Sequence, residues 1–342
     1  MTSRNLLIAT TAFILATFTR THAATLPGPA SDRYSIIAHI PGPDGGWDDA
    51  SIDSTTHTLF LARNSGVLAL ALRTRRITPV FVPGRGVHSA IAIPGTHLGV
   101  STNGASNSVS VFGARSGRVT DEIPVGRAPD SLAYDSRTGL VAVMNHDSGT
   151  VSLIDPRKRS LIGTIVVGGR LEVAAPSGTG LVYANVADRN EIAVIDVAAR
   201  SVRARYALHG CDDPSGLAFD RASDFLMAVC GNGFTKFLRA SDGRNIATVR
   251  TGLGSDGLIL DEKRRRLFVP AGRDGTLTIF SMKHHAPRVI QVLRIPTGTR
   301  LGALDPETGN LYLPSAKLGP PIAPSPWPSV VPGSFQILVV AN

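Results

Sequence analysis

The chain has 342 residues, with 35 glycines, 23 prolines and only 6% aromatic residues, a composition typical of many short strands joined by tight turns. Its formal net charge is +9 at neutral pH, but the cations lack interleaved aromatic residues, which argues against a nucleic-acid-binding protein. Beyond the N-terminal segment no helical periodicity is present, which disfavours a helical fold.

The N-terminal segment, residues 1–23, predicts a secretory signal peptide. Arg4 gives a positive start, residues 6–18 are apolar, and residues 21–23 followed by Ala24 offer a small-residue cleavage site. The apolar run is short for a membrane span, which needs about 20 residues, so a retained anchor is the alternative. We therefore expect a periplasmic or secreted protein whose mature chain has no transmembrane segment.

A loop between two apolar runs recurs seven times along the mature chain. The recurring positions, called the top rim below, are Asp48, His88, Asp130, Glu172, Ser215, Asp256 and Arg300, at steps of 40, 42, 42, 43, 41 and 44 residues. A period of about 40–45 residues built from short strands is the signature of a propeller blade. The sequence thus predicts an all-β protein, with residues 24–342 forming a single seven-bladed β-propeller domain of four-stranded antiparallel blades.

The clearest blade shows four apolar runs separated by turn residues. Residues 131–135, 140–144, 150–154 and 161–167 are expected to be strands a, b, c and d, counted outwards from the axis. In this order the d–a and b–c loops share one face, the top face, and the a–b and c–d turns share the other, the bottom face.

The same blade resembles the YVTN-type β-propeller family of exported bacterial proteins. The resemblance rests on residues 140–145, 148–155 and 163–168, with a second copy in residues 181–185 and 192–196. It implies a β-propeller over nearly the whole mature chain. Members serve as binding proteins, scaffolds and occasional enzymes, so the family does not by itself select a function.

The two ends of the chain are expected to meet in blade 7. The last repeat ends at residues 334–341, which match strand c, and it then lacks strand d. Residues 34–40 form an unassigned apolar run at the start of the mature chain. This N-terminal strand should complete blade 7, which would remove an open sheet edge.

The two cysteines, Cys211 and Cys230, lie in one repeat. Cys211 precedes strand a and Cys230 ends strand b, two points that share the top face. Because an exported protein meets an oxidising compartment, we expect a disulfide between them; two inert buried thiols are the alternative.

Charged and aromatic side chains gather on the expected top face. The candidate ligand-binding residues are Asp48, Asp49, His88, Asp130, His146, Glu172, Asp213, Asp256 and Trp327. Four of them, His88, Asp130, Glu172 and Asp256, occupy one repeat position and are candidates to bind a divalent cation such as calcium, manganese or zinc. The alternatives are a general acid/base set and a hydrated polar funnel.

Blade 7 carries a proline-rich insertion, residues 319–333, in place of a short b–c loop. It contains Trp327 and lies on the top face. We interpret it as a lid or an aromatic docking wall, with an unconstrained excursion as the alternative.

The bottom turns collect cations, among them residues 73–76, 115–118, 157–159 and 263–266. They could dock the protein to an anionic surface, or they could be solvated turns that maintain solubility.

The chain has no Gly-x-Ser-x-Gly, P-loop, His-Glu-x-x-His or Cys-x-x-Cys-His motif. We therefore expect a monomeric ligand-binding or protein-interaction scaffold that uses its top-face funnel and has no turnover of its own. No cofactor is indicated beyond a candidate divalent cation. The alternative is a metal-assisted hydrolase or lyase, similar to lactonase-type propellers, that uses the acidic and histidine residues at the funnel mouth.

Overall fold

The computed structural model describes residues 33–283, 286–321 and 328–342. The predicted signal peptide and Trp327 lie outside the described residues. Within the described ranges, none of the helices reaches the length and apolarity that a membrane span requires.

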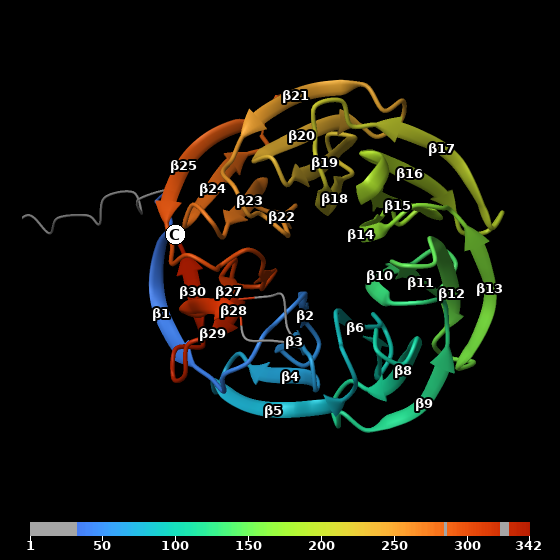
Figure 1. Cartoon of the computed structure of the whole chain (residues 1–342), viewed down its shortest axis with the longest axis horizontal. Helices are drawn as coiled ribbons and strands as arrows, with labels where there is room; N and C mark the ends of the chain where they lie inside the picture. The colour runs from blue at the N-terminus through green and yellow to red at the C-terminus, as the bar shows by residue number, and fades with distance from the viewer. Residues whose placement is uncertain (1–32, 284–285, 322–327) are drawn as a thin grey trace, which may run out of the picture.

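Seven four-stranded antiparallel sheets surround one axis, as predicted (Figure 1). Blade 1 contains β2 (Ala50–Asp53), β3 (Thr58–Arg63), β4 (Gly66–Ala71) and β5 (Arg76–Pro83). Blade 2 contains β6 (Ala90–Ala92), β7 (Leu98–Asn103), β8 (Ser108–Gly113) and β9 (Val119–Pro124). Blade 3 contains β10 (Pro129–Asp135), β11 (Leu140–Asn145), β12 (Thr150–Asp155) and β13 (Ser160–Val166). Blade 4 contains β14 (Leu171–Pro176), β15 (Leu181–Val186), the 3₁₀ turn η1 (Ala187–Arg189), β16 (Glu191–Asp196) and β17 (Ser201–Ala207).

The remaining blades follow the same order. Blade 5 contains β18 (Pro214–Asp220), β19 (Phe225–Cys230), β20 (Phe234–Arg239) and β21 (Asn245–Arg250), and blade 6 contains β22 (Ile259–Asp261), β23 (Arg266–Ala271), β24 (Thr276–Ser281) and β25 (Arg288–Arg294). Blade 7 is completed from both ends of the chain by β26 (Ala303–Leu304), β27 (Leu311–Ser315), β30 (Gln336–Ala341) and β1 (Ser35–Pro41).

The predicted ring closure is confirmed. The N-terminal β1 pairs antiparallel with β30, from Ser35 opposite Ala341 to Pro41 opposite Gln336. Just before β1, the backbone N–H of Tyr34 donates to Gln291 of blade 6, and the Gln291 amide donates back to the Tyr34 carbonyl. The first and last segments of the fold are thus hydrogen-bonded to each other.

The core lies between neighbouring blades. Middle strands such as β11 and β12 are almost entirely buried, because a neighbouring blade covers each face of their sheet. Outer strands such as β17 alternate between half-buried and exposed residues. One apolar cluster joins Met144 and Leu153 of blade 3 to Val182 and Ala193 of blade 4. Burial of apolar surface between blades is therefore the main contribution to the stability of the ring.

The predicted disulfide between Cys211 and Cys230 is present, with the two Cα atoms 5.2 Å apart. Both residues are buried. The bridge connects the loop before β18 to the end of β19, as the strand assignment required.

The proline-rich insertion includes a short antiparallel hairpin of β28 (Leu318–Pro321) and β29 (Pro328–Val330) beside blade 7 (Figure 1). Its C-terminal end is held by the Asp44 carboxylate, which accepts hydrogen bonds from the backbone N–H groups of Gly333 and Phe335. The lid or docking role of this segment stays a prediction.

Some of the basic side chains of the bottom face form contacts within the fold. Arg265 forms two hydrogen bonds of 2.6 Å with the buried Asp220 of the preceding blade. Arg264 pairs with Asp261, and Arg266 is buried. These three cations stabilise turns and blade contacts, and docking of the remaining ones to an anionic surface stays a prediction.

Candidate functional site

The top rim is built where each innermost strand begins. A residue in the left-handed backbone region stands two positions before the rim residue in five blades: Gly86, Ala128, Asp213, Gly254 and Gly298. This residue turns the chain from the outer strand of one blade to the inner strand of the next. The b–c loops are tied to these turns, since the N–H of His146 donates to the carbonyl of Ala128. Both loop types therefore share the top face, as predicted.

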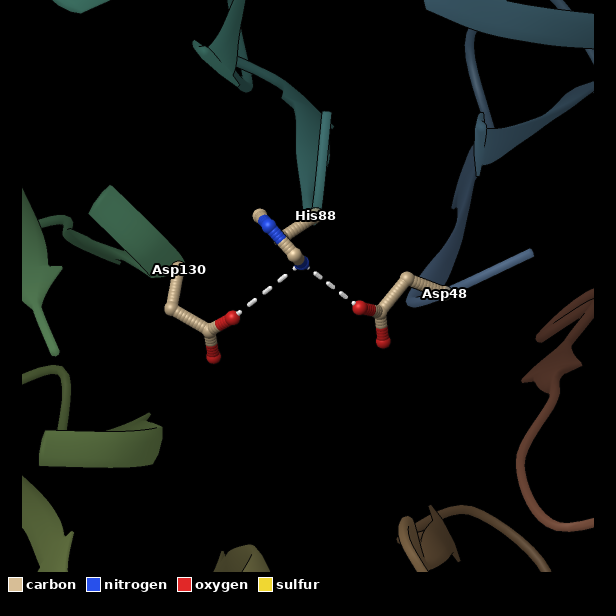
Figure 2. A group of neighbouring side chains, drawn as sticks. All are labelled: Asp48, His88 and Asp130. Atoms are coloured by element: carbon tan, nitrogen blue, oxygen red, sulfur yellow. Dashed lines mark hydrogen bonds and ion pairs between the residues drawn. The ribbon is translucent and has the colours of Figure 1, made fainter. Parts of the chain in front are cut away.

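Three rim side chains from three blades meet at one point (Figure 2). The Nδ1 atom of His88 lies 2.8 Å from Oδ2 of Asp48 and 3.4 Å from Oδ1 of Asp130. Asp48 precedes β2, His88 precedes β6 and Asp130 lies at the start of β10. One imidazole nitrogen is thus shared by two carboxylates that are far apart in the sequence.

The charge state of His88 follows from this geometry. The hydrogen bond with Asp48 raises the pKa of His88 to about 9, against the opposing effect of burial, and Asp130 adds to the rise. At neutral pH the ring is an imidazolium that donates from Nδ1. A metal ion at this nitrogen would have to displace that proton, because only the neutral ring binds metal.

The pKa of Asp130 is perturbed as well. Burial raises its pKa well above the ordinary value, and the negative charges of Asp48 and Glu172 raise it further. The imidazoles of His88 and His146 act in the opposite direction. Carboxylates that converge on one place disfavour each other's ionisation, so a cation placed beside Asp130 would be attracted.

A second pair lies next to this cluster. Nδ1 of His146, in the loop after β11, is 3.1 Å from Oε1 of Glu172 and 3.1 Å from the carbonyl of Leu171. The hydrogen bond with Glu172 raises the pKa of His146. His146, one of the predicted top-face candidates, therefore contacts the rim through Glu172.

A third pair closes the rim between blades 6 and 7. Nε of Arg300 donates to Oδ2 of Asp256 at 2.8 Å, and a terminal nitrogen of Arg300 donates to the carbonyl of Trp47 at 2.7 Å. The guanidinium carbon also lies 5.5 Å from the centroid of the Trp47 ring. Burial raises the pKa of Asp256, with Arg300 opposing it. The repeat placed Arg300 on the rim, but Arg300 was not predicted as a site residue, although its repeat position was sufficient to indicate it. Nothing in the sequence pattern indicated that Trp47 contributes to the site.

Asp49 lies behind the rim and not on it. Ser89 donates to one carboxylate oxygen at 2.9 Å, and the N–H of Ala50 donates to the other at 2.8 Å. Burial raises the pKa of Asp49 to about 6. Its contacts join blade 1 to blade 2, which gives it a structural role.

Asp213 is separated from the central groups. Its side chain is 71% exposed and lies 3.5 Å from Arg170, and its backbone forms the left-handed turn before the rim residue. The structure therefore does not bring Asp213 together with the other candidates, because it occupies the turn position and not the rim position.

The four predicted metal ligands do not form one set. His88 and Asp130 share a cluster whose third member is Asp48, with one ligand atom from each all within 4.8 Å of one another. Glu172 and Asp256 instead pair with His146 and Arg300.

Solved structures with the same fold are similar to this chain at low sequence identity. Hydrazine synthase of Kuenenia stuttgartiensis matches with a TM-score of 0.69 and 16% identity over 84% of this chain and 96% of that one. A chain of the mitotic checkpoint complex matches with a TM-score of 0.71 and 16% identity, over 88% and 95%. No protein-family model and no curated protein sequence matches. At this identity the likeness shows the β-propeller fold alone.

Proposed function

We propose that the chain is an exported β-propeller that binds a positively charged group of a ligand or protein partner at its top rim, without turnover of its own. The single observation that carries the proposal is the position of Asp130. Its half-buried carboxylate lies beside Asp48 and Glu172; burial raises its pKa, and the two negative charges raise it further.

The charge of the rim supports a cationic ligand. Four carboxylates, those of Asp48, Asp130, Glu172 and Asp256, face three cationic side chains, those of His88, His146 and Arg300. When all seven groups are ionised, four negative and three positive charges leave a net charge of −1. An ammonium or guanidinium group from a partner would neutralise it and would relieve the repulsion at Asp130. Because the pKa of Asp130 and of Asp256 is raised, a bound cation would also favour the ionised form of these two carboxyls.

Titration calorimetry with a tri-lysine peptide and its fully acetylated form tests the proposal. Tri-lysine should bind and the acetylated peptide should not, because only the former carries the side-chain charges. Asp130→Asn should weaken binding by about tenfold, as expected for the loss of one charge-assisted contact. Asp135→Asn, at the other end of β10, is the matched control and should leave the affinity unchanged. Equal affinity for both peptides, or no binding of either, would contradict the proposal.

The location of the protein is part of the same proposal. A signal peptide over residues 1–23, the resemblance to exported YVTN-type propellers and the disulfide all support export. Mass analysis of the protein after expression in bacteria should give a mature chain that begins at Ala24, as a monomer with no reactive thiol. Recovery of the full-length chain with Met1 still present would count against export by this route.

One observation favours a second candidate, a metal-assisted hydrolase or lyase. Two carboxylates and one imidazole, from Asp48, His88 and Asp130, converge within 4.8 Å, a donor set that manganese or zinc accepts. When bound, such an ion would supply a Lewis acid or an activated water. Elemental analysis of protein purified without added metal tests this candidate, together with its melting temperature before and after chelation. A metal-free protein whose melting temperature is unchanged by added zinc or manganese would contradict this candidate, and cation binding would then be the only function proposed.

A further inference from the structure

A cavity of about 460 Å³ lies between blades 4 and 5, away from the top rim. Its polar edge comes from bottom-face turns: Ser177 and Thr179 from the turn after β14, Arg221 and Asp224 from the turn after β18, and Ser241 from the turn after β20. The volume is within the usual range for small-molecule sites, about 300–1,000 Å³.

Three aromatic rings line this cavity. Tyr183 of β15 and Phe219 of β18 have ring centroids 5.3 Å apart with planes inclined at 40°. Tyr206 of β17 adds a third ring, and its hydroxyl is held by the carbonyl of Ala240 at 3.0 Å. A flat apolar ligand could therefore contact rings supplied by three strands of two blades, which favours aromatic over aliphatic groups.

Two guanidinium groups stand at the edge of the same cavity. Arg203, on β17, is exposed, and Arg221 donates to the carbonyl of Ser177. Among the described residues, no carboxylate lies within ion-pair distance of either group, in contrast to Arg264 and Arg265 on the same face.

The cavity also contains one carboxylate. Oδ2 of Asp224 accepts hydrogen bonds from the N–H and the hydroxyl of Ser241, which fix the side chain in its turn. Two cations and one anion leave a net charge of +1 at the cavity edge. This charge matches a ligand with a single negative charge better than one with two.

We propose that this cavity binds a small aromatic monocarboxylate, with its ring against Tyr183, Tyr206 and Phe219 and its carboxylate toward Arg203 and Arg221. Planar guanidinium groups are suited to carboxylates because they offer parallel N–H donors. The site is independent of the top rim, since it lies at the bottom turns and shares no residue with the rim. Its test therefore succeeds or fails separately from the proposed cation binding.

Binding of 4-fluorobenzoate to the full mature chain, followed by fluorine NMR, tests the proposal. Saturable binding with a Kd at or below about 5 mM is expected, a range suitable for a ligand of this size. Two competitors separate the contributions: cyclohexanecarboxylate keeps the charge without the aromatic ring, and benzyl alcohol keeps the ring without the charge. Each should displace the probe at least about tenfold less well than benzoate does.

Arg203→Gln should raise the Kd for 4-fluorobenzoate by at least about fivefold, and Phe219→Leu should raise it by about threefold or more. Arg115→Gln is the matched control, because Arg115 is an exposed bottom-face arginine of blade 2 outside the cavity. It should leave the Kd unchanged. Arg203 is exposed on an outer strand, so folding of its variant can be verified by an unchanged melting temperature. An Arg203→Gln protein that binds like the Arg115→Gln protein would overturn the proposal. So would the absence of saturable binding, or equal competition by cyclohexanecarboxylate and benzoate.

Discussion

Asp130 and Asp135 lie five residues apart on one strand, β10, yet they belong to opposite kinds of environment. Asp135, at the bottom end, is fully buried and accepts hydrogen bonds from the N–H and hydroxyl of Thr138 and from the N–H of Gly180. Asp130, at the top end, faces His88 and the carboxylates of other blades. The bottom carboxylate is satisfied mainly by its own turn, whereas the top carboxylate depends on neighbours about 40 residues away.

The same contrast holds around the ring. Asp53, Asp220 and Asp261 also end their inner strands, Asp305 follows directly after β26, and all four accept hydrogen bonds from the next turn. This repetition indicates a structural role. The rim position instead changes its residue type from blade to blade. The position at the end of the inner strand, which is an aspartate in five of the seven blades, thus serves the fold, whereas the rim position varies among the blades and supplies the side chains that pair between blades.

The largest expected effect belongs to the bottom face. Asp220→Ala should lower the free energy of unfolding by about 3–5 kcal/mol, because it leaves the partly buried guanidinium of Arg265 without its partner. Denaturant unfolding measures the loss. In the Asp220→Ala/Arg265→Met protein the loss should be smaller than in Asp220→Ala alone. A loss below about 1 kcal/mol in Asp220→Ala would show that the pair is not structural.

Removal of the disulfide tests how much this covalent link in the top face of blade 5 contributes to the stability of the protein. The bridge closes a loop with a sequence separation of 19 residues. Its loss in Cys211→Ser/Cys230→Ser should cost about 3 kcal/mol in the chain-entropy model. Thermal unfolding with and without reductant measures the effect. The reductant should lower the melting temperature of the wild type toward that of the variant and leave the variant unchanged; an equal response of both proteins would contradict the prediction.

The two aspartates of β10 give the most direct comparison. Asp135→Asn should destabilise the protein by about 1–3 kcal/mol, since an amide nitrogen cannot accept a buried hydrogen bond. Asp130→Asn should leave stability within about 0.5 kcal/mol of the wild type or raise it slightly, because it removes repulsion among the rim carboxylates. Equal unfolding free energies for the two variants would show that the top and bottom ends of β10 do not differ as described.

The smallest expected effect is the pH dependence at the rim. The pKa of His88 is raised to about 9, while an unfolded histidine titrates near about 6.5. Protonation of a histidine whose pKa is raised by folding stabilises the folded state. This contribution is complete below about pH 6.5 and is lost as the pH rises through about 9. The side chain is 41% exposed, so solvent screening limits the contribution to about 1 kcal/mol.

The difference in unfolding free energy between wild type and His88→Gln, measured at about pH 6 and about pH 9.5, reports this contribution together with the effect of His88 on Asp130. The wild type should have the larger advantage at the lower pH. Burial raises the pKa of Asp49 to about 6, so the fold loses stability as the pH rises from about 4 to about 6 and Asp49 ionises. This pH range lies below the range in which His88 titrates. A difference that does not change with pH would argue against the His88–Asp48 hydrogen bond as the cause.

Much of the fold could be predicted from the sequence. The order of strands in a blade, the closure of blade 7 by β1 and the proximity of Cys211 to Cys230 follow from the repeat, because strand alternation and turn residues act over a few residues. The candidate site could be predicted only as a set of positions. Rim membership identified His88 and Asp130, but the same reasoning left out Arg300 and included Asp213, which lies in the turn.

The sequence by itself determined that seven like segments form one ring and that their equivalent loops face the same way, since each blade is specified locally and the ring follows from repetition. Only the tertiary structure decided which rim side chains pair: Asp48 and Asp130 with His88, Glu172 with His146, and Asp256 with Arg300. It also decided that Arg265 stabilises the neighbouring blade and that a cavity opens between blades 4 and 5. These side-chain pairs join residues between 26 positions apart (His146 and Glu172) and 45 positions apart (Asp220 and Arg265). They depend on side-chain orientation and on how closely adjacent blades pack.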